Sequence, residues 1–176
     1  MANREALREL QTRLASRLQG ARTEGMSVAW LALRGGGKNF LFPLGQSGEI
    51  FPLANLQPVP YAREWFRGVI NIRGGLYGVV DLAAFIVADT GIARAEPPSQ
   101  DLSVVTLNVA LEVNCALQVD GLLGLRGGDA FVSSSSADPG APTYFGNQFI
   151  DSAGEQWQEI DLRILSQTPQ FLSISA

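Results

Sequence analysis

The side chains best suited to act as nucleophiles are one cysteine, Cys115, and a run of four serines, 133–136. Serine and cysteine nucleophiles need a base beside them, most often a histidine. The chain contains no histidine, which excludes Ser-His-Asp and Cys-His catalysis, histidine metal sites and a phosphorelay through a histidine of this chain. Cys115 lies in the alternating apolar run ALEVNCALQV, which favours a small buried side chain over a nucleophile. We therefore expect a protein that is not an enzyme, with a small hydrolase as the enzymatic alternative.

Three carboxylates occupy similar positions along the chain. Asp81, Asp120 and Asp161 end the apolar runs VVDL, QVDG and EIDL. A metal site or an acid–base pair is one interpretation of such a set. An aspartate at the end of a strand more often caps the next turn or helix by accepting backbone N–H bonds. We predict capping and a duplicated structure, with no metal and no cofactor.

Glycines follow Arg34, Arg73 and Arg126, and the first of these clusters reads RGGGKN. A phosphate-binding Walker loop needs the spacing G-x-x-x-x-G-K followed by Ser or Thr. Position 32 is Ala and position 39 is Asn, so the loop is not present. The glycines are better explained as positive-φ residues at tight strand connections, with Arg34 and Arg126 as solvated turn charges.

The composition limits the class of protein. The 176 residues are 46% hydrophobic and 17% charged, which is enough for one domain or for two small intertwined units. The net charge of −4 is unfavourable for binding nucleic acid or an anionic membrane. The beginning of the chain, MANREALREL, has no apolar signal-peptide core, and a single cysteine permits no internal disulfide. We expect a cytoplasmic protein without direct membrane insertion.

A helix is predicted over residues 4–19, within an N-terminal helical extension of residues 1–25. Its leucines follow the three- and four-residue spacing of one helix face: Leu7, Leu10, Leu14 and Leu18. Asn3 is the expected N-cap and Gly20 the expected end of the helix. We expect this helix to pack on its own domain; a helix that binds a partner is the alternative.

The remainder, residues 26–176, is predicted to be mainly β, with short strands and many turn signals, as in small barrels or a sandwich. Strands are expected at Val28–Leu33, Phe40–Leu44, Glu49–Phe51, Leu102–Val113, Asn114–Val119, Phe149–Ile150, Gln158–Leu162 and Gln170–Ile174, and in a hairpin within Phe66–Ile86. A surface loop is expected at Ser133–Thr143, and one or two helical turns around Leu82–Val87. The expected core includes Val79, Val80, Leu82, Val119 and Leu122.

The hairpin segment FRGVINIRGGLYGVVDL closely resembles the signature of the CheW-like domain of bacterial chemosensory adaptors, which commonly reads GVxNLRGxxxPVxDL. The matching positions are Gly68, Val69, Asn71, Arg73, Gly74, Val79, Asp81 and Leu82. Downstream, CALQVDGLLGL is similar to the second conserved run of that family. The resemblance covers about residues 28–165 and is greatest to adaptors of type IV pilus (twitching motility) chemosensory systems.

The resemblance implies two intertwined five-stranded SH3-like barrels, preceded here by the N-terminal amphipathic helix, and no active site. It also implies an adaptor that couples the cytoplasmic tip of a methyl-accepting chemotaxis receptor to a CheA-type histidine kinase, whose regulatory domain has the same fold. By motif position, the residues implied to bind the receptor or the kinase are Arg73, Asn71, Gly74, Ser47 and Glu49. Two positions depart from the family pattern: Gly78 replaces a usual proline, and Ser47 replaces a frequent valine.

Two alternatives remain open at this point. Arg73 either grips a partner or binds carbonyl groups of its own turn. An SH3-like binding module unrelated to chemosensing would use an aromatic groove, for which Trp65, Phe66 and Tyr77 are the candidates, although core packing is the expected role of at least one of them.

Overall fold

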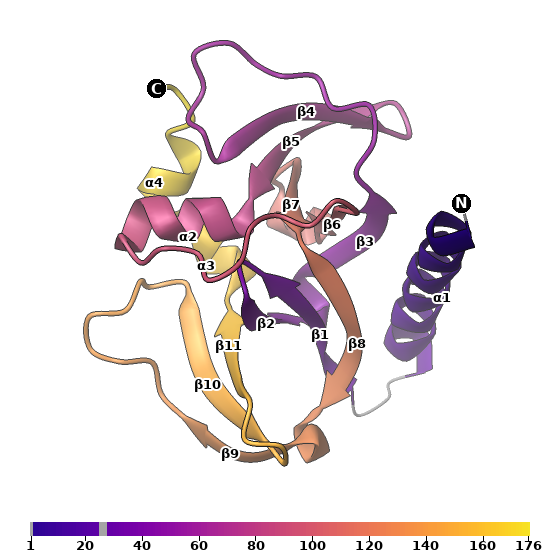
Figure 1. Cartoon of the computed structure of the whole chain (residues 1–176), viewed down its shortest axis with the longest axis vertical. Helices are drawn as coiled ribbons and strands as arrows, with labels where there is room; N and C mark the ends of the chain where they lie inside the picture. Colours follow the sequence, from indigo (N-terminus) through magenta and orange to yellow (C-terminus); the bar gives the residue numbers. More distant parts are fainter. Residues whose placement is uncertain (1, 25–27) are drawn as a thin grey trace.

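The computed structural model describes residues 2–24 and 28–176, in which one long helix precedes two curled β-sheets (Figure 1). The helix, α1, spans Ala2–Glu24. It is longer than predicted, and Asn3 and Gly20 both lie inside it. The alanines, leucines, arginines and glutamates around Gly20 favour helix strongly enough to outweigh the cost of about 1 kcal/mol of one internal glycine.

The first sheet has six strands in the order β8-β1-β2-β11-β10-β9. Their bounds are β1 Val28–Gly35, β2 Lys38–Pro43, β8 Gly121–Gly127, β9 Phe131–Ser135, β10 Phe145–Asp151 and β11 Gln156–Ile160. β2 and β11 pair in parallel, and the other neighbours are antiparallel. The parallel pair joins the beginning of the chain to its end.

The second sheet has five strands in the order β3-β6-β7-β5-β4. Their bounds are β3 Ser47–Pro52, β4 Phe66–Ile72, β5 Gly75–Asp81, β6 Ser103–Leu107 and β7 Cys115–Val119. The chain starts in the six-stranded sheet, builds the five-stranded sheet and then returns. The two units are therefore intertwined as expected, although one of them has six strands rather than five.

Each sheet curls around a small apolar cluster, and a larger cluster lies between the sheets. The small clusters are centred on Val79 and Val104 in the five-stranded sheet and on Leu41 and Trp157 in the six-stranded sheet. The large cluster includes Leu33, Phe42, Val80, Leu82, Leu117, Val119 and Leu165. Of the expected core residues, Val79, Val80, Leu82 and Val119 are buried, whereas Leu122 is half-buried at the edge of the large cluster.

Short helices connect and complete the sheets: α2 Leu82–Thr90, α3 Leu162–Gln167, α4 Pro169–Leu172 and the 3-10 turns η1 Leu44–Gln46, η2 Val109–Leu111 and η3 Gly128–Ala130. Asp81 caps α2 by accepting from the N–H of Ala84 at 3.1 Å, and Asp161 caps α3 by accepting from the N–H of Ile164 at 3.0 Å. The capping prediction is confirmed for these two aspartates. Asp120 caps no helix, but it accepts from the N–H of Gly36 at 2.7 Å and forms an ion pair with Arg94 at 2.8 Å.

Three predicted elements differ from the structure. The segment Gln170–Ile174 is not a strand, because Pro169 begins α4, and its fixed φ suits the first position of a helix. Three serines of the predicted loop lie in β9, where their backbones pair with β10. The predicted strand Leu102–Val113 ends at Leu107 and is followed by η2.

Two arginines expected to be solvated turn charges have partners in the structure. Arg34 forms an ion pair with Glu96 at 3.0 Å. The guanidinium of Arg126 lies over the ring of Trp157, 5.7 Å from its centroid. Both arginines belong to strands, β1 and β8, so their side chains have neighbours on the sheet surface.

Candidate partner-binding site

The site begins at the tip of the β4–β5 hairpin. Ile72 pairs with Gly75, which leaves Arg73 and Gly74 as the central residues of the turn. Their φ angles are 51° and 82°, and two positive φ values are typical of a type I′ hairpin turn. The side-chain oxygen of Asn71 accepts from the N–H of Gly74 at 3.0 Å and so secures the turn. The role predicted for the glycine, to supply positive φ, is confirmed at this position.

Arg73 reaches from this turn to Glu49 on β3. Nη1 donates to Oε1 and Nη2 lies beside Oε2, each at 2.7 Å, so the two planar groups meet as a bidentate pair. The guanidinium carbon also lies 5.9 Å from the centroid of the Phe51 ring. β3 and β4 form opposite edges of the five-stranded sheet, so the hairpin tip joins the two edges of the curled sheet. The partner of Arg73 within this chain is therefore a distant carboxylate as well as a neighbouring ring.

The Arg73–Glu49 pair remains accessible to solvent. The side chains are 71% and 48% exposed. Exposed ion pairs contribute about 0–1 kcal/mol, because water and salt screen the charges. The pair therefore opens at little cost, and its guanidinium can then bind a carboxylate or carbonyl of another protein.

The position of Glu49 depends on the residue before it. The N–H of Glu49 donates to Oγ1 of Thr106 on the neighbouring strand at 2.7 Å. A Cβ at Gly48 would collide with that same hydroxyl and would lie 2.8 Å from the carbonyl oxygen of Leu107. Gly48 is thus required for β3 to approach β6 closely enough to hold Glu49 below the hairpin tip.

Ser47 does not lie on this surface. Its side chain is buried, and its hydroxyl donates to the carbonyl oxygen of Pro43 at 3.0 Å. The pairing of β3 with β6 shifts register between Ser47 and Ile50. This irregularity breaks the simple alternation that would place Ser47 and Glu49 on one face. Ser47 is therefore not exposed to a partner on this surface.

Sequence reasoning missed three residues of the site: Phe51, Gly48 and Thr106. Phe51 stands two positions after Glu49 in the same strand, and this spacing could have placed both on one face. The roles of Gly48 and Thr106 depend on the pairing of β3 with β6, for which the local sequence carries no signal.

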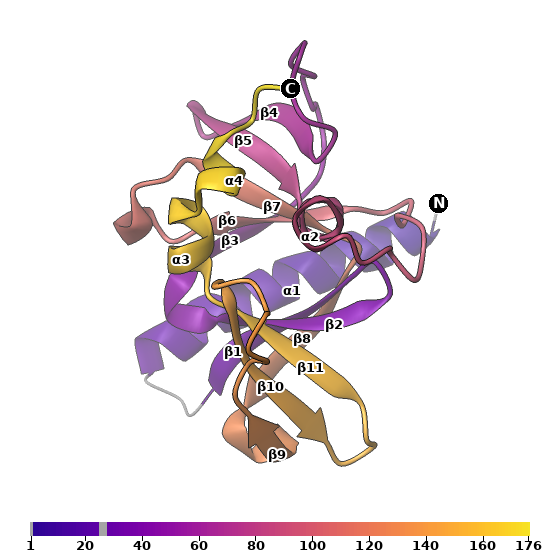
Figure 2. The same cartoon turned by 90° about the vertical axis from the view of Figure 1, so that its left-hand side faces the viewer.

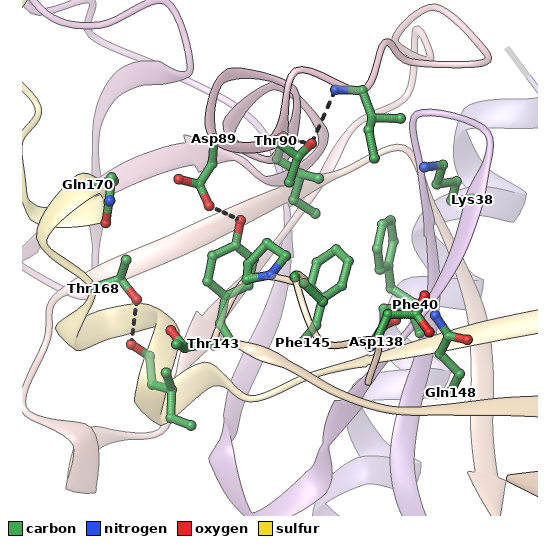
Figure 3. A pocket seen from close by; sticks show the side chains of 18 of the residues that line it. Lys38, Phe40, Asp89, Thr90, Asp138, Thr143, Phe145, Gln148, Thr168 and Gln170 are labelled. Carbon is green, nitrogen blue, oxygen red and sulfur yellow. Dashed lines mark hydrogen bonds between the residues drawn. The ribbon is translucent and has the colours of Figure 1, made fainter. Parts of the chain in front are cut away.

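A groove of about 1250 Å³ lies elsewhere, between the end of α2, the segment 138–145, β11 and the two C-terminal helices (Figure 3). The hydroxyl of Tyr144 donates to Oδ2 of Asp89 in its wall at 2.7 Å. Burial, and secondly this hydrogen bond, raises the pKa of Tyr144. Thr168 donates to the carbonyl oxygen of Ile164 at 2.8 Å. These hydroxyls are engaged in holding the walls together.

The aromatic residues considered for an SH3-like binding groove do not form one. Trp65 is buried and packs edge-on against Phe85, with ring centroids 5.0 Å apart. Phe66 packs against the cluster between the sheets, and Tyr77 against the cluster inside the five-stranded sheet. Trp65 and Phe66 thus pack on the cluster between the sheets, and Tyr77 packs on a different one.

The candidate nucleophiles lie in different surroundings. Cys115 is buried, and burial raises the pKa of its thiol from the ordinary 9.0 to about 12, so the thiol stays protonated at neutral pH. Ser133, Ser134 and Ser135 are exposed on the edge strand β9. Among the side chains that the structure describes, no three Cys, Asp or Glu residues are grouped as metal ligands. Of the helices in residues 2–24 and 28–176, none is long and apolar enough to span a membrane.

Comparison with known proteins agrees with this geometry. The CheW-like domain family matches residues 29–167. The chain is 28% identical over 114 residues to Protein PilI of Pseudomonas aeruginosa, a match that covers 65% of this chain and 61% of that protein. The fold is similar to the crystal structure of the scaffolding protein TtCheW from Thermoanaerobacter tengcongensis. That similarity has a TM-score of 0.64 at 16% identity and covers 82% of this chain and 96% of the other.

The family match begins after α1 and includes both sheets, the β4–β5 hairpin and α3. It confirms the resemblance that the hairpin motif carried, and the similarity to TtCheW confirms the mainly β, two-barrel fold. The chain belongs to the CheW-like domain family.

Proposed function

We propose that this protein is a non-enzymatic, cytoplasmic adaptor of a chemosensory array. It couples a methyl-accepting chemoreceptor to a CheA-type histidine kinase, in a system similar to the one that contains PilI. The observation that carries the proposal is the family membership, which extends over both sheets. The similarity to PilI, which covers 61% of that protein, supports the pilus-type pathway as part of the proposal.

The proposed contact surface is the tip of the β4–β5 hairpin together with the exposed part of β3. It consists of Arg73, Gly74, Asn71, Glu49 and Phe51. A guanidinium presents five donors in a planar fork and binds carboxylates and carbonyls of a partner with defined geometry. The half-buried ring of Phe51 adds an apolar contact beside the charges. A surface that combines an arginine, an aromatic ring and a polar rim is typical of protein interfaces.

The chemistry of the chain supports a role without catalysis. It has no histidine, and its one thiol is protonated. The hydroxyls of Tyr144 and Thr168 in the walls of the groove are engaged in hydrogen bonds within the chain. On this proposal the kinase carries the phosphoryl transfer. The adaptor contributes only the arrangement of its two partners.

The test is reconstitution with purified components. The full chain is mixed with the regulatory domain of the CheA-type kinase and a cytoplasmic fragment of the receptor, both from the same organism, and the mixture is separated by size-exclusion chromatography. We expect a ternary complex and faster kinase autophosphorylation when the adaptor is present. A chain that binds neither component at concentrations of tens of micromolar contradicts the proposal.

A further inference from the structure

Helix α1 lies across the place where the two sheets meet. It contacts β3, which ends the five-stranded sheet, β8, which ends the six-stranded sheet, and the turn η1 (Figures 1 and 2). We call the surface formed by β3, η1, β8 and Ser103 at the start of β6 the seam. α1 thus covers edge strands of both sheets at once.

The contact between α1 and the seam is a narrow stripe. Gln11 and Leu14 are buried and Leu7 is half-buried, so the stripe follows the spacing i, i+4, i+7 of one helix face. Leu14 joins the large cluster between the sheets, to which Ile50 of β3 also belongs. Nε2 of Gln11 donates to Oγ of Ser103 at 2.5 Å.

Outside this stripe, the described side chains of α1 are mostly exposed, and many of them are charged. Leu10, which belongs to the predicted leucine stripe, is 42% exposed. The exposed charged residues are Arg4, Glu5, Arg8, Glu9 and Arg13. α1 therefore rests on the seam through one well-buried leucine, one half-buried leucine and a polar contact at the centre of the stripe. A polar residue at the centre of a helix interface fixes its register at a cost in stability.

The helix is also suited to exist apart from the seam. Its sequence is rich in alanine, leucine, arginine, glutamate and glutamine, which favour helix intrinsically. Glu9 and Arg13 stand at i and i+4 in the orientation that stabilises an isolated helix. Detachment would expose few apolar side chains of the described part.

β3 takes part in both surfaces. Ile50 faces the cluster that Leu14 of α1 enters, whereas the neighbouring Glu49 is exposed and holds Arg73. A partner that binds Arg73 and continues along β3 meets α1. The seam already accommodates a helix, so the partner that fits it best is another helix.

We propose that the seam is a helix-binding groove, and that α1 is its internal occupant, which an amphipathic helix of a partner displaces. The incoming helix presents two apolar residues at i and i+7 with an amide side chain between them, because this is the pattern that Leu7, Gln11 and Leu14 place on the seam. The identification of that partner as the chemoreceptor rests on the proposed function; the exchange of helices does not.

The probe is a fluorescein-labelled synthetic peptide of residues 1–24, titrated with the full-length chain and followed by fluorescence anisotropy. In the wild-type chain the attached α1 competes with the peptide. Leu14→Ala in the chain weakens the docking of the attached helix. We therefore expect the Leu14→Ala chain to bind the wild-type peptide at least tenfold more tightly than the wild-type chain does. Leu10→Ala changes an exposed leucine of the same helix and should leave the affinity within twofold of the wild-type value.

On the Leu14→Ala chain, two peptides are compared. The peptide that itself carries Leu14→Ala should bind at least tenfold more weakly than the wild-type peptide. Equal affinities of the wild-type, Leu10→Ala and Leu14→Ala chains overturn the proposal, as does a folded Leu14→Ala chain that binds no peptide. If Leu14→Ala loses its cooperative thermal transition, Gln11→Ala takes its place, with an expected gain of threefold or more and the same criterion for rejection.

A final arm separates this inference from the proposed function. The unlabelled receptor fragment is added to the complex of the peptide with the Leu14→Ala chain. Displacement of the peptide supports both proposals. Binding of the peptide without displacement by the receptor contradicts the receptor as the partner at the seam, while helix exchange at the seam stands.

Discussion

Arg73 and Glu49 are 24 positions apart in the sequence, and their side chains form a bidentate ion pair with two N–O distances of 2.7 Å. The turn that presents Arg73 holds it at a φ of 51°, a value that few residues other than glycine adopt. The pair connects the hairpin tip to the opposite edge of the sheet. It also places a charged and solvent-accessible surface within the residues that match the CheW-like domain family.

The pair itself should contribute little to stability. We expect a double-mutant cycle of Arg73→Ala and Glu49→Ala, measured by urea denaturation, to give a coupling free energy below about 1 kcal/mol. The coupling should decrease further in 0.5 M salt, because exposed charges are screened. A coupling of several kcal/mol would mean that the pair is a structural clamp rather than a surface that opens for partners.

Gly48 should be far more sensitive to substitution than its neighbour Gly45. A Cβ at position 48 meets the hydroxyl of Thr106 and two backbone carbonyls, whereas a Cβ at position 45 meets nothing within 4 Å. We expect Gly48→Ala to destabilise the protein by roughly 1–3 kcal/mol, as overpacking does, and Gly45→Ala to be nearly neutral. Thermal melts of the two variants provide the comparison. Similar melting temperatures would show that β3 has room to move away from β6.

Cys115 should be unreactive until the protein unfolds. Burial raises the pKa of its thiol from 9.0 to about 12, so the native protein holds little thiolate at pH 8. Labelling with 5,5′-dithiobis(2-nitrobenzoic acid) at pH 8 should be slow in buffer and rapid in denaturant. Rapid labelling of the native protein would contradict the buried position of this residue.

The same shift in pKa makes stability depend on pH. The unfolded thiol ionises near pH 9 and the folded thiol only near pH 12, so the unfolded state releases its proton first. The contribution of Cys115 to the free energy of unfolding is therefore complete below about pH 9 and decreases as the pH rises toward 12. Cys115→Ala should reduce this decrease when the two proteins are compared by denaturation across that range.

The local part of the site was accessible from the sequence, and the distant part was not. Asn71, Arg73 and Gly74 follow from the hairpin pattern, because a tight turn between two β runs is a local signal. The contact of Arg73 with Glu49 requires the five-stranded sheet to curl until its edges approach each other. Ser47 was placed wrongly for a related reason, since the register shift in β3 turns its side chain inward.

The departure at Gly78 also becomes clear only from strand pairing. Its N–H donates to the carbonyl oxygen of Asn114 at 3.0 Å, a bond that a proline at this position could not make. A Cβ would also lie 3.0 Å from the ring of Phe66. The glycine therefore allows both the hydrogen bond and the close approach of an aromatic ring.

The sequence predicted the strands and α2 better than the C-terminal helices. Both helices follow a strand through an aspartate cap, but α2 is a nine-residue helix with a long apolar run, whereas α3 spans only Leu162–Gln167. The cap signal at Asp161 and the proline at position 169 were both present. Such short helices have little periodicity, and packing against the large cluster through Leu162 and Leu165 stabilises α3.

The most direct test of the proposed contact surface is the affinity of Arg73 variants for the kinase regulatory domain and the receptor fragment, measured by biolayer titration beside a thermal melt of each variant. Arg73→Ala should keep stability within about 0.5 kcal/mol of wild type and bind about tenfold more weakly, because a hydrogen-bonded guanidinium contributes on the order of 1–3 kcal/mol at an interface. Arg73→Lys should recover part of the affinity. As a control, Arg163→Ala changes an exposed arginine of α3 and should bind as wild type. Unchanged binding by a well-folded Arg73→Ala variant would contradict the assignment of this surface to the partners.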